Sequence, residues 1–359
     1  MSIQDRLDRL RANFDEAGVD VFFSIDECTN HYLSGFSGSN SGIVIGKSEA
    51  VFYTDFRYTE QAAEQVSSKF ERRETKAAVV TDLAEAIKEI GAGKAAFEPD
   101  KIKHGIVLKL GELVPDTELV PVTDWTARMR VIKTEDEVAR IRKSAEITDK
   151  ALGEALGVMR DGMTERELSA EISYRLKLAG ADKEAFDVIS LFGARSSLPH
   201  GTPSDKALEA GELVLVDMGA RLDGYNSDLT RTFVWGRMPN DEIRSIYDVV
   251  GEAQSKALDV ISAGLDCKEA DAAARKIIED AGYANTFGHG LGHGVGLEVH
   301  EKPHLSPRST EKLEEGMVVT VEPGIYCPGL GGVRIEDLVV VAKDGCEILS
   351  SFGKEWRIL

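Results

Sequence analysis

The 359-residue sequence has no long apolar run. A helix that spans a bilayer needs about 20 consecutive, predominantly apolar residues, and no segment has that pattern. The first residues also lack the apolar core of a signal peptide. Apolar side chains instead recur on one helical face from Ile3 to Phe14, with Ser2 placed to cap this helix and Gly18 to end it. We therefore expect no membrane partner.

The sequence has few cysteines, and its basic residues are fewer than its acidic ones. The four cysteines have no closely spaced pair, so we expect free thiols in a reducing cytoplasm. The 43 basic residues are outnumbered by 62 acidic residues, and the net charge of -19 argues against binding to nucleic acid or to an anionic membrane. With 42% hydrophobic and 29% charged residues, the composition is typical of a globular protein, and the length predicts two domains.

The pattern of residues changes near position 125. Before it, the segments 19–24, 41–46 and 49–54 have the composition of strands, residues 82–90 predict a short helix, and residues 115–125 resemble a connector. After it, a long amphipathic helix begins at the capping pattern of Thr134 and Glu137 and runs toward Met159. We therefore expect an α/β domain over 1–125 and a second domain over 126–359.

The second domain contains an internal repeat. Residues 147–159 align with residues 249–261, so that Ala151 matches Ala253 and the spacing between the copies is 102 positions. Each copy contains a helix, a turn with glycine, a second helix with a capping pattern (164–167 and 266–269) and a glycine stop. Strand-like segments follow each helix pair. The sequence therefore predicts a mixed α/β (α+β) fold with two pseudo-symmetric α-α-β halves.

Acidic residues occur in strand contexts of both halves, where an unpaired carboxylate is costly. They are Asp217, Asp228, Glu322 and Glu336. If these carboxylates converge at the centre of the two halves, two divalent cations would neutralise their repulsion. Oxygen ligands with one imidazole suit manganese, iron or cobalt better than a structural zinc. A metal pair that bridges a water lowers its pKa and produces hydroxide, which indicates hydrolysis.

The run "HGLGHGVGLEVHE" (289–301) contains three of the seven histidines. His300 to His304 spell H-E-x-x-H, a zinc-protease pattern that requires both histidines on one face of a helix. Pro303 would break that helix, so we reject the zinc-protease interpretation. We expect His304 to have no role in the site.

Six separated motifs resemble the "pita-bread" metallopeptidases, the group of methionine aminopeptidase, aminopeptidase P and prolidase. They are "LPHG", "VDMG", "NSDLTRT", "HGLGHGVGLEVHE", "VEPG" and "VRIED", and the resemblance covers residues from about 125 to 359. It implies a pita-bread catalytic domain that follows a smaller creatinase-like N-terminal domain in the chain. It also implies two metal ions, manganese or cobalt ahead of iron or zinc. The implied ligands are Asp217, Asp228, His293, Glu322 and Glu336, with Asp228 and Glu336 bridging both ions.

The resemblance also implies roles for side chains around the metals. His200 and His300 would hydrogen bond the scissile carbonyl or the developing oxyanion. Glu322 would act as the base for the attacking water as well as a ligand. His289 would line the substrate pocket, and Arg334 would hold an outer carboxylate or orient the substrate. The glycines around His293 would let the backbone approach the metals.

Members of this group differ in substrate. Methionine aminopeptidases lack a comparable N-terminal domain and the "VRIED" motif, and creatinase and non-catalytic binding relatives lack the ligand set, so an intact set favours an enzyme over a metal-stabilised binding protein. Prolidase (Xaa-Pro dipeptidase) and aminopeptidase P remain. The short N-terminal domain favours the dipeptidase. We expect a homodimer that takes a small peptide with proline at its second position, and we interpret His31 and Arg57 as solvated loop residues.

Overall fold

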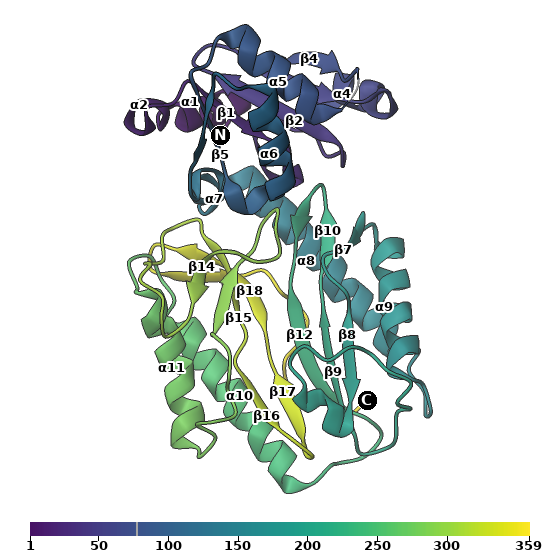
Figure 1. Ribbon diagram of the computed structural model, residues 1–359. Coiled ribbons are helices and arrows are strands. Elements are labelled where there is room, and N and C mark those ends of the chain that lie inside the picture. The colour runs from purple at the N-terminus through teal and green to yellow at the C-terminus, as the bar shows by residue number, and fades with distance from the viewer. Residues whose placement is uncertain (77) are drawn as a thin grey trace. The chain divides into compact units, whose positions relative to one another are not determined.

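The computed structural model describes residues 1–76 and 78–359, which divide into two units, Met1–Arg130 and Val131–Leu359 (Figure 1). We expected the boundary after residue 125. Helix α7 (Trp125–Arg130) packs against α1 (Ile3–Arg11), so the division falls after Arg130 instead.

The N-terminal unit is built on a six-stranded mixed sheet in the order β4-β3-β2-β1-β5-β6. Its strands are β1 (Val21–Ser24), β2 (Ser41–Gly46), β3 (Ala50–Thr54), β4 (Glu71–Glu74), β5 (Lys94–Phe97) and β6 (Glu118–Pro121). The three expected strands are therefore confirmed. The expected connector contains β6, which pairs in parallel with β5. The sequence did not predict β6 because it contains Pro121, and proline argues against a strand. Proline is tolerated here because β6 is an edge strand of the sheet.

The helices of this unit pack on the sheet and on one another. They are α1, α2 (Phe14–Ala17), α3 (Glu27–Ser34), α4 (Thr59–Gln65), α5 (Val79–Ile90), α6 (His104–Leu113) and α7, with 3-10 turns η1 (Phe56–Tyr58) and η2 (Pro99–Lys101). The first amphipathic segment forms two helices, α1 and α2, where we expected one. Ser2 does cap α1 through a capping box with Asp5, and Gly18 ends α2 in the left-handed conformation.

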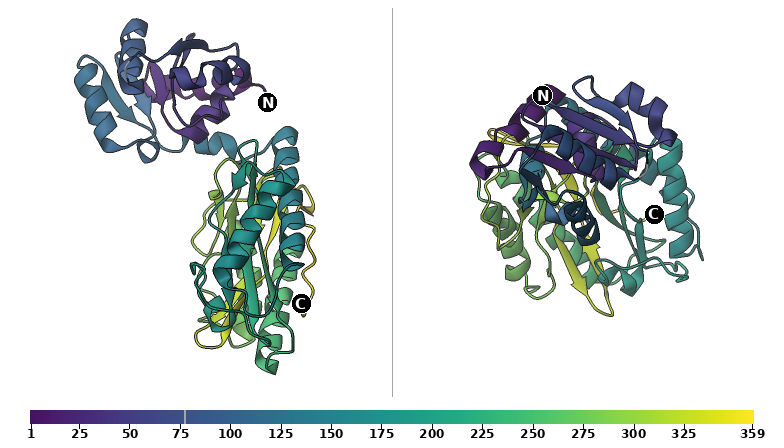
Figure 2. Two further views of the ribbon diagram at one scale, coloured as in Figure 1. Left: turned by 90° about the vertical axis from the view of Figure 1, so that its right-hand side faces the viewer. Right: turned by 45° about the horizontal axis from the view of Figure 1, so that its top comes forward.

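The C-terminal unit contains the two predicted helix pairs, α8 (Glu135–Leu156) with α9 (Glu165–Ala179) and α10 (Asp241–Val260) with α11 (Cys267–Asp280). Thr134 and Thr164 form the expected capping boxes. Asp266 precedes α11 but makes no side-chain cap; its carboxylate pairs with Lys312 at 2.9 Å instead. Figures 1 and 2 show the helices on the outside of the strands, one pair on each half.

Strands follow each helix pair, as expected. In the first half these are β7 (Lys183–Glu184), β8 (Ile189–Phe192), β9 (Leu213–Met218), β10 (Ala220–Leu222), β11 (Tyr225–Asn226) and β12 (Leu229–Val234), with the 3-10 turn η3 (Gly193–Ser197) after β8. In the second half they are β13 (Gly292–Gly294), β14 (Glu301–Leu305), β15 (Val318–Val321), β16 (Gly324–Cys327), β17 (Gly331–Arg334), β18 (Asp337–Ala342) and β19 (Gly345–Ile348). The mixed α/β class is confirmed.

The two halves meet along β12, β17 and β18. The Glu336 amide donates to the Thr230 carbonyl (3.1 Å), and Thr232 exchanges two hydrogen bonds with the Arg334 backbone. Each half also has its own apolar core between its helix pair and its strands. The predicted convergence of strands at a shared centre is therefore observed.

No helix in the described part of the chain is both long enough and apolar enough to span a membrane. The four cysteines are free, as expected.

An ion pair buried between the halves joins Arg231 of β12 to Asp337 of β18 at 2.7 Å, and both side chains are 1% exposed. Gln254 and Lys354 also donate to the Asp337 carboxylate. Removing one partner of such a pair leaves an uncompensated buried charge, which costs about 3–5 kcal/mol.

We expect Asp337→Ala to lower the free energy of unfolding of the C-terminal unit by about 3–5 kcal/mol. Urea unfolding of chelator-treated protein, followed by tryptophan fluorescence, measures it, since Trp235 and Trp356 lie in this unit. Glu347→Ala is the matched control: its pair with Arg142 is on the surface, where loss costs about 1 kcal/mol or less. Equal effects of the two substitutions would contradict the prediction.

Candidate metal centre

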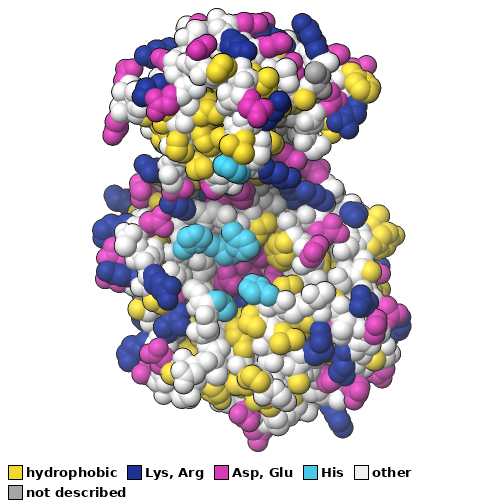
Figure 3. Space-filling view, viewed as in Figure 1, with side chains coloured by type: hydrophobic (Ala, Val, Ile, Leu, Met, Phe, Trp, Pro, Cys, Tyr) yellow, Lys and Arg dark blue, Asp and Glu magenta, His cyan; other side chains and the backbone are white. Residues whose placement is uncertain are grey.

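The C-terminal unit contains a cavity of about 640 Å³. Figure 3 shows histidines around a hollow whose floor exposes acidic side chains. The lining combines the expected site residues with other polar residues and a smaller apolar group: Phe186, Asp187, Ile189, Pro199, His200, Asp217, Asp228, His289, Gly290, Gly292, His293, Val299, His300, His304, Ser306, Glu322, Arg334 and Glu336.

The carboxylates on its floor come from strands of both halves. Asp217 lies near the end of β9 and Asp228 directly precedes β12, whereas Glu322 directly follows β15 and Glu336 lies between β17 and β18. One oxygen from each of Asp217, Asp228 and Glu336 lies within 4.8 Å of the others. The structure thus brings together carboxylates of the two halves, which are about a hundred positions apart in sequence.

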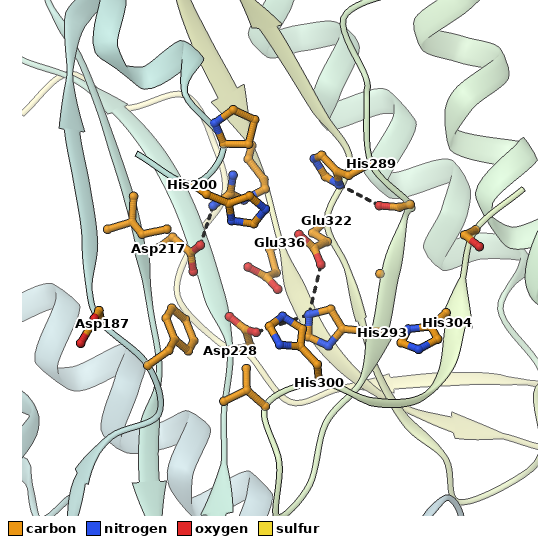
Figure 4. Close-up of a pocket in the computed structure, with 18 residues that line it drawn as sticks. Asp187, His200, Asp217, Asp228, His289, His293, His300, His304, Glu322 and Glu336 are labelled. Atoms are coloured by element: carbon orange, nitrogen blue, oxygen red, sulfur yellow. Dashed lines mark hydrogen bonds and ion pairs between the residues drawn. The ribbon is translucent and has the colours of Figure 1, made fainter. Parts of the chain in front are cut away.

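His293 lies on β13 and completes this cluster (Figure 4). Its Nε2 is 3.7 Å from Asp228 Oδ2 and 3.4 Å from Glu322 Oε1. Its Nδ1 donates to the Gly294 carbonyl at 3.0 Å, which fixes the tautomer and leaves the Nε2 lone pair directed at the carboxylates. The hydroxyl of Thr320 accepts the His293 amide (3.0 Å) and donates to Glu322 (3.1 Å).

The glycines beside His293 serve a different purpose from the one that we expected. A Cβ on Gly292 would lie 2.1 Å from the Thr320 carbonyl oxygen, and one on Gly294 would lie 2.2 Å from the Lys302 carbonyl oxygen. Glycine is therefore needed because β13 approaches its neighbours β15 and β14 so closely. The close strand contact, and not a loop against the metals, sets the position of the imidazole.

Burial dominates the electrostatics of the cluster. It raises the pKa of all four carboxyls, to about 7 for Glu322. For Asp228 and Glu336 the pKa is raised well above its ordinary range, because repulsion from neighbouring carboxylates adds to burial. Burial and the nearby His300 lower the pKa of His293 to about 4, so this imidazole is neutral at pH 7. A neutral imidazole among carboxylates is suited to bind a cation.

The donor set fits two divalent cations. Within residues 1–76 and 78–359, Oδ1 of Asp217 is a buried carboxylate oxygen without a hydrogen-bond partner, and leaving such an atom unpaired is costly. This unpaired oxygen can bind a cation. The other carboxylates and the His293 imidazole of the cluster lie close enough to provide further ligand atoms.

Arg334 is tied to this cluster by three contacts. Its guanidinium donates to Asp217 Oδ2 (2.6 Å), to the Thr230 hydroxyl (2.9 Å) and to the Tyr326 hydroxyl (2.9 Å). Thr230 in turn donates to Glu336 at 2.6 Å. Of the two roles that we expected for Arg334, these contacts favour holding an outer carboxylate.

His289 lines the cavity with both of its ring nitrogens occupied. Nδ1 donates to the Gly290 carbonyl (2.8 Å), which leaves Nε2 to accept a hydrogen bond from the Tyr326 hydroxyl (2.9 Å). Burial, together with the charge of Arg334, lowers the pKa of His289 to about 4. Its ring is therefore neutral and can contact a substrate only through its face or edge.

The two expected oxyanion histidines lie on opposite sides of the carboxylates (Figure 4). His200 is in the segment after η3, and His300 directly precedes β14, with its ring 4.3 Å from that of His293. Residues 301–305 form a strand, which confirms that H-E-x-x-H is not a helical zinc site here. His304 lines the same cavity and pairs in register with His293, so it lies closer to the site than a bystander needs to; that it has no role stays a prediction.

Sequence reasoning missed Thr230, Thr320 and Tyr326, and the apolar wall of Phe186, Ile189, Pro199 and Val299. Two of these had a usable signal. Thr230 is two positions after Asp228, and Thr320 is two positions before Glu322, so alternation along a strand puts each threonine on the side of its carboxylate.

Comparisons with known proteins agree with this geometry. Residues 139–343 match the model of metallopeptidase family M24, and residues 6–132 match that of the creatinase/prolidase N-terminal domain. A Xaa-Pro dipeptidase of Pyrococcus furiosus is 38% identical over 98% of this chain and 99% of its own length.

Two solved structures are similar over nearly the whole chain. A Xaa-Pro dipeptidase from Bacillus anthracis has a TM-score of 0.96 at 41% identity, covering 100% of both chains. An X-Pro aminopeptidase from Thermotoga maritima has a TM-score of 0.89 at 37% identity, covering 95% of this chain and 98% of that one. With its catalytic-domain model, its N-terminal-domain model and these relatives all in agreement, the chain belongs to metallopeptidase family M24.

Proposed function

We propose that this protein hydrolyses the peptide bond before proline in Xaa-Pro dipeptides. The observation that carries the proposal is the buried carboxylate cluster with the Nε2 atom of His293 directed into it, in a chain that belongs to a metallopeptidase family. Relatives named Xaa-Pro dipeptidase, similar over the full length, support the substrate.

Asp217, Asp228, His293, Glu322 and Glu336 would hold two divalent cations, manganese or cobalt, with Asp228 and Glu336 shared between them. When bound, the cations would supply an activated water near neutral pH. Glu322 takes the proton of this water and passes it to the leaving nitrogen of proline. A carboxylate beside this water is placed for both transfers.

His200 and His300 act on the substrate oxygen. Each offers an imidazole N–H at the edge of the carboxylate cluster, where the scissile carbonyl becomes an oxyanion. The apolar wall of Phe186, Ile189, Pro199 and Val299 lies in the same cavity and is suited to pack a pyrrolidine ring. His289 and Arg334 also contribute to the cavity surface on which the dipeptide lies.

Aminopeptidase P activity on longer peptides is the second candidate, favoured by the similarity to the X-Pro aminopeptidase of Thermotoga maritima. The third candidate is a metal-binding protein without activity, and the intact set of donor residues argues against it.

We also propose that the protein is a homodimer and that it is cytoplasmic. The free thiols agree with a reducing compartment. Light scattering coupled to size exclusion would measure the mass against 39.1 kDa for one chain.

Hydrolysis should depend on metal and on peptide length. We expect chelator-treated protein to lose activity on an Xaa-Pro dipeptide and to regain it with manganese or cobalt, because the carboxylates alone repel one another and activate no water. Chromatography of the first amino acid released from the dipeptide, and from an Xaa-Pro-Xaa tripeptide in a parallel reaction, makes the measurement. Equal activity with and without metal would refute the proposal. Turnover of the tripeptide alone would assign an aminopeptidase, and turnover of neither, with metal bound, would assign a binding protein.

The two neighbouring histidines should differ in metal content. We expect His293→Ala to lose bound metal and activity, since its imidazole is a ligand. We expect His300→Ala to keep its metal and lose turnover by about 10²–10³-fold, as when one oxyanion donor is removed.

Plasma emission spectrometry of the purified variants measures metal per chain. His104→Ala, the loss of an exposed histidine in the N-terminal unit, is the control for effects of substitution and handling that do not involve the site. Loss of metal in both His293→Ala and His300→Ala would show that our division between ligand and oxyanion donor is wrong.

A further inference from the structure

Glu165, the first residue of α9, is a buried carboxylate outside the metal cluster. Its side chain is 0% exposed, although α9 needs no acidic residue at that position for its own cap, which Thr164 and Glu167 provide. A carboxylate is buried only at a cost, unless several donors compensate it. Its contacts therefore indicate what it stabilises.

The donors to Glu165 come from both ends of the segment 193–204. Oε1 accepts the Phe192 amide at 2.8 Å, and Oε2 accepts the amide and the hydroxyl of Ser204 at 2.8 and 2.6 Å. Nε of Arg195 donates to both oxygens, at 3.1 and 2.9 Å. One carboxylate thus closes the base of a loop that contains η3 and the "LPHG" motif.

Arg195 extends this hold to the middle of the loop. While Nε donates to Glu165, the second arm of the guanidinium donates to the Thr202 carbonyl at 2.8 Å, two residues after His200. On the other side, a Cβ added to Gly201 would lie 2.7 Å from the Leu191 side chain, so the loop is seated tightly on β8. His200 itself is exposed at the cavity and lies in the middle of the loop that these contacts hold.

The internal repeat shows whether the fold itself requires a carboxylate at the position of Glu165. At the spacing of 102 positions, Glu165 corresponds to Cys267, which begins α11. Cys267 is a buried, uncharged thiol, and its helix is packed against its half in the same way. The helix pair therefore does not require a carboxylate at this position. At this position of the repeat only the first half has a carboxylate, and that carboxylate binds the loop that contains His200.

We propose that Glu165 is a positioning residue for His200: through Phe192, Arg195 and Ser204 it holds the loop so that the imidazole faces the carboxylate cluster. This role rests on the proposed function of His200 in oxyanion binding. The hold itself is a property of the loop, and it can be measured without activity.

The main test is Glu165→Gln. The amide keeps the shape but replaces one acceptor oxygen by a donor, which then faces the N–H groups of Phe192, Arg195 or Ser204. We expect faster hydrogen exchange across 193–204, unchanged metal content, and a fall in kcat/KM of about 10–100-fold, the scale of a misplaced catalytic group. Arg195→Lys, a milder variant on a partly exposed residue, keeps one contact with Glu165 and loses the arm to Thr202, so it should act in the same direction.

Glu167→Gln is the matched control. It changes a carboxylate in the same helical turn that caps α9 without touching 193–204, so exchange in the loop should not change. A double variant identifies the route. If Glu165 acts through His200, then Glu165→Gln combined with His200→Ala is no less active than His200→Ala alone.

Loop exchange equal to wild type in Glu165→Gln, or two activity losses that multiply in the double variant, would overturn the proposal. A wild-type enzyme that cleaves no Xaa-Pro peptide would refute the proposed function instead. The exchange experiment then still decides whether Glu165 holds the loop.

Discussion

Repulsion among buried carboxylates is the constraint on which the rest of the C-terminal unit depends. Asp217, Asp228, Glu322 and Glu336 lie together at the centre of the two halves, and the guanidinium of Arg334 donates to one of them, Asp217. Burial opposes their ionisation, as their raised pKa values indicate. Such a cluster is compatible with a folded protein because cations can neutralise it. A site built in this way is poised for metal before any substrate arrives.

The scaffold around the cluster resists this repulsion with hydrogen bonds that cross between the halves. Arg231, in the first half, pairs with Asp337 in the second, directly beside Glu336. Thr230 connects the same regions by donating to Glu336 while it accepts from Arg334. These contacts join strands that are separated by about a hundred residues. Separating the two halves would therefore also move the proposed metal-binding side chains apart.

Much of this arrangement could be predicted from the sequence, and what could not has identifiable physical reasons. The capping box at Thr134 is a local signal, so its helix was found close to its true start. The carboxylates stood out because they interrupt apolar strands. Glu165 did not stand out, since it sits in the first turn of an amphipathic helix, where acidic residues are ordinary, and its partners lie 27 to 39 positions away. The position of His304 in the cavity could not be predicted, because strand register, and not local pattern, places it opposite His293.

The two histidines assigned to the oxyanion lie between strands of different halves. His200 lies between β8 and β9 of the first half, and His300 lies between β13 and β14 of the second. Each half also holds the loop on its inner side by a buried carboxylate of its second helix. In the second half Asp271 accepts the Leu291 amide (3.0 Å) and pairs with Arg275, which donates to the His289 carbonyl (2.8 Å). The two halves differ in the segment that is held. In the first half it is the loop that contains His200, and in the second it is the glycine-rich segment that leads to His293. Each half thus contributes two carboxylates to the cluster. The glycine-rich strand β13 of the second half makes the site asymmetric, because it adds the imidazole of His293.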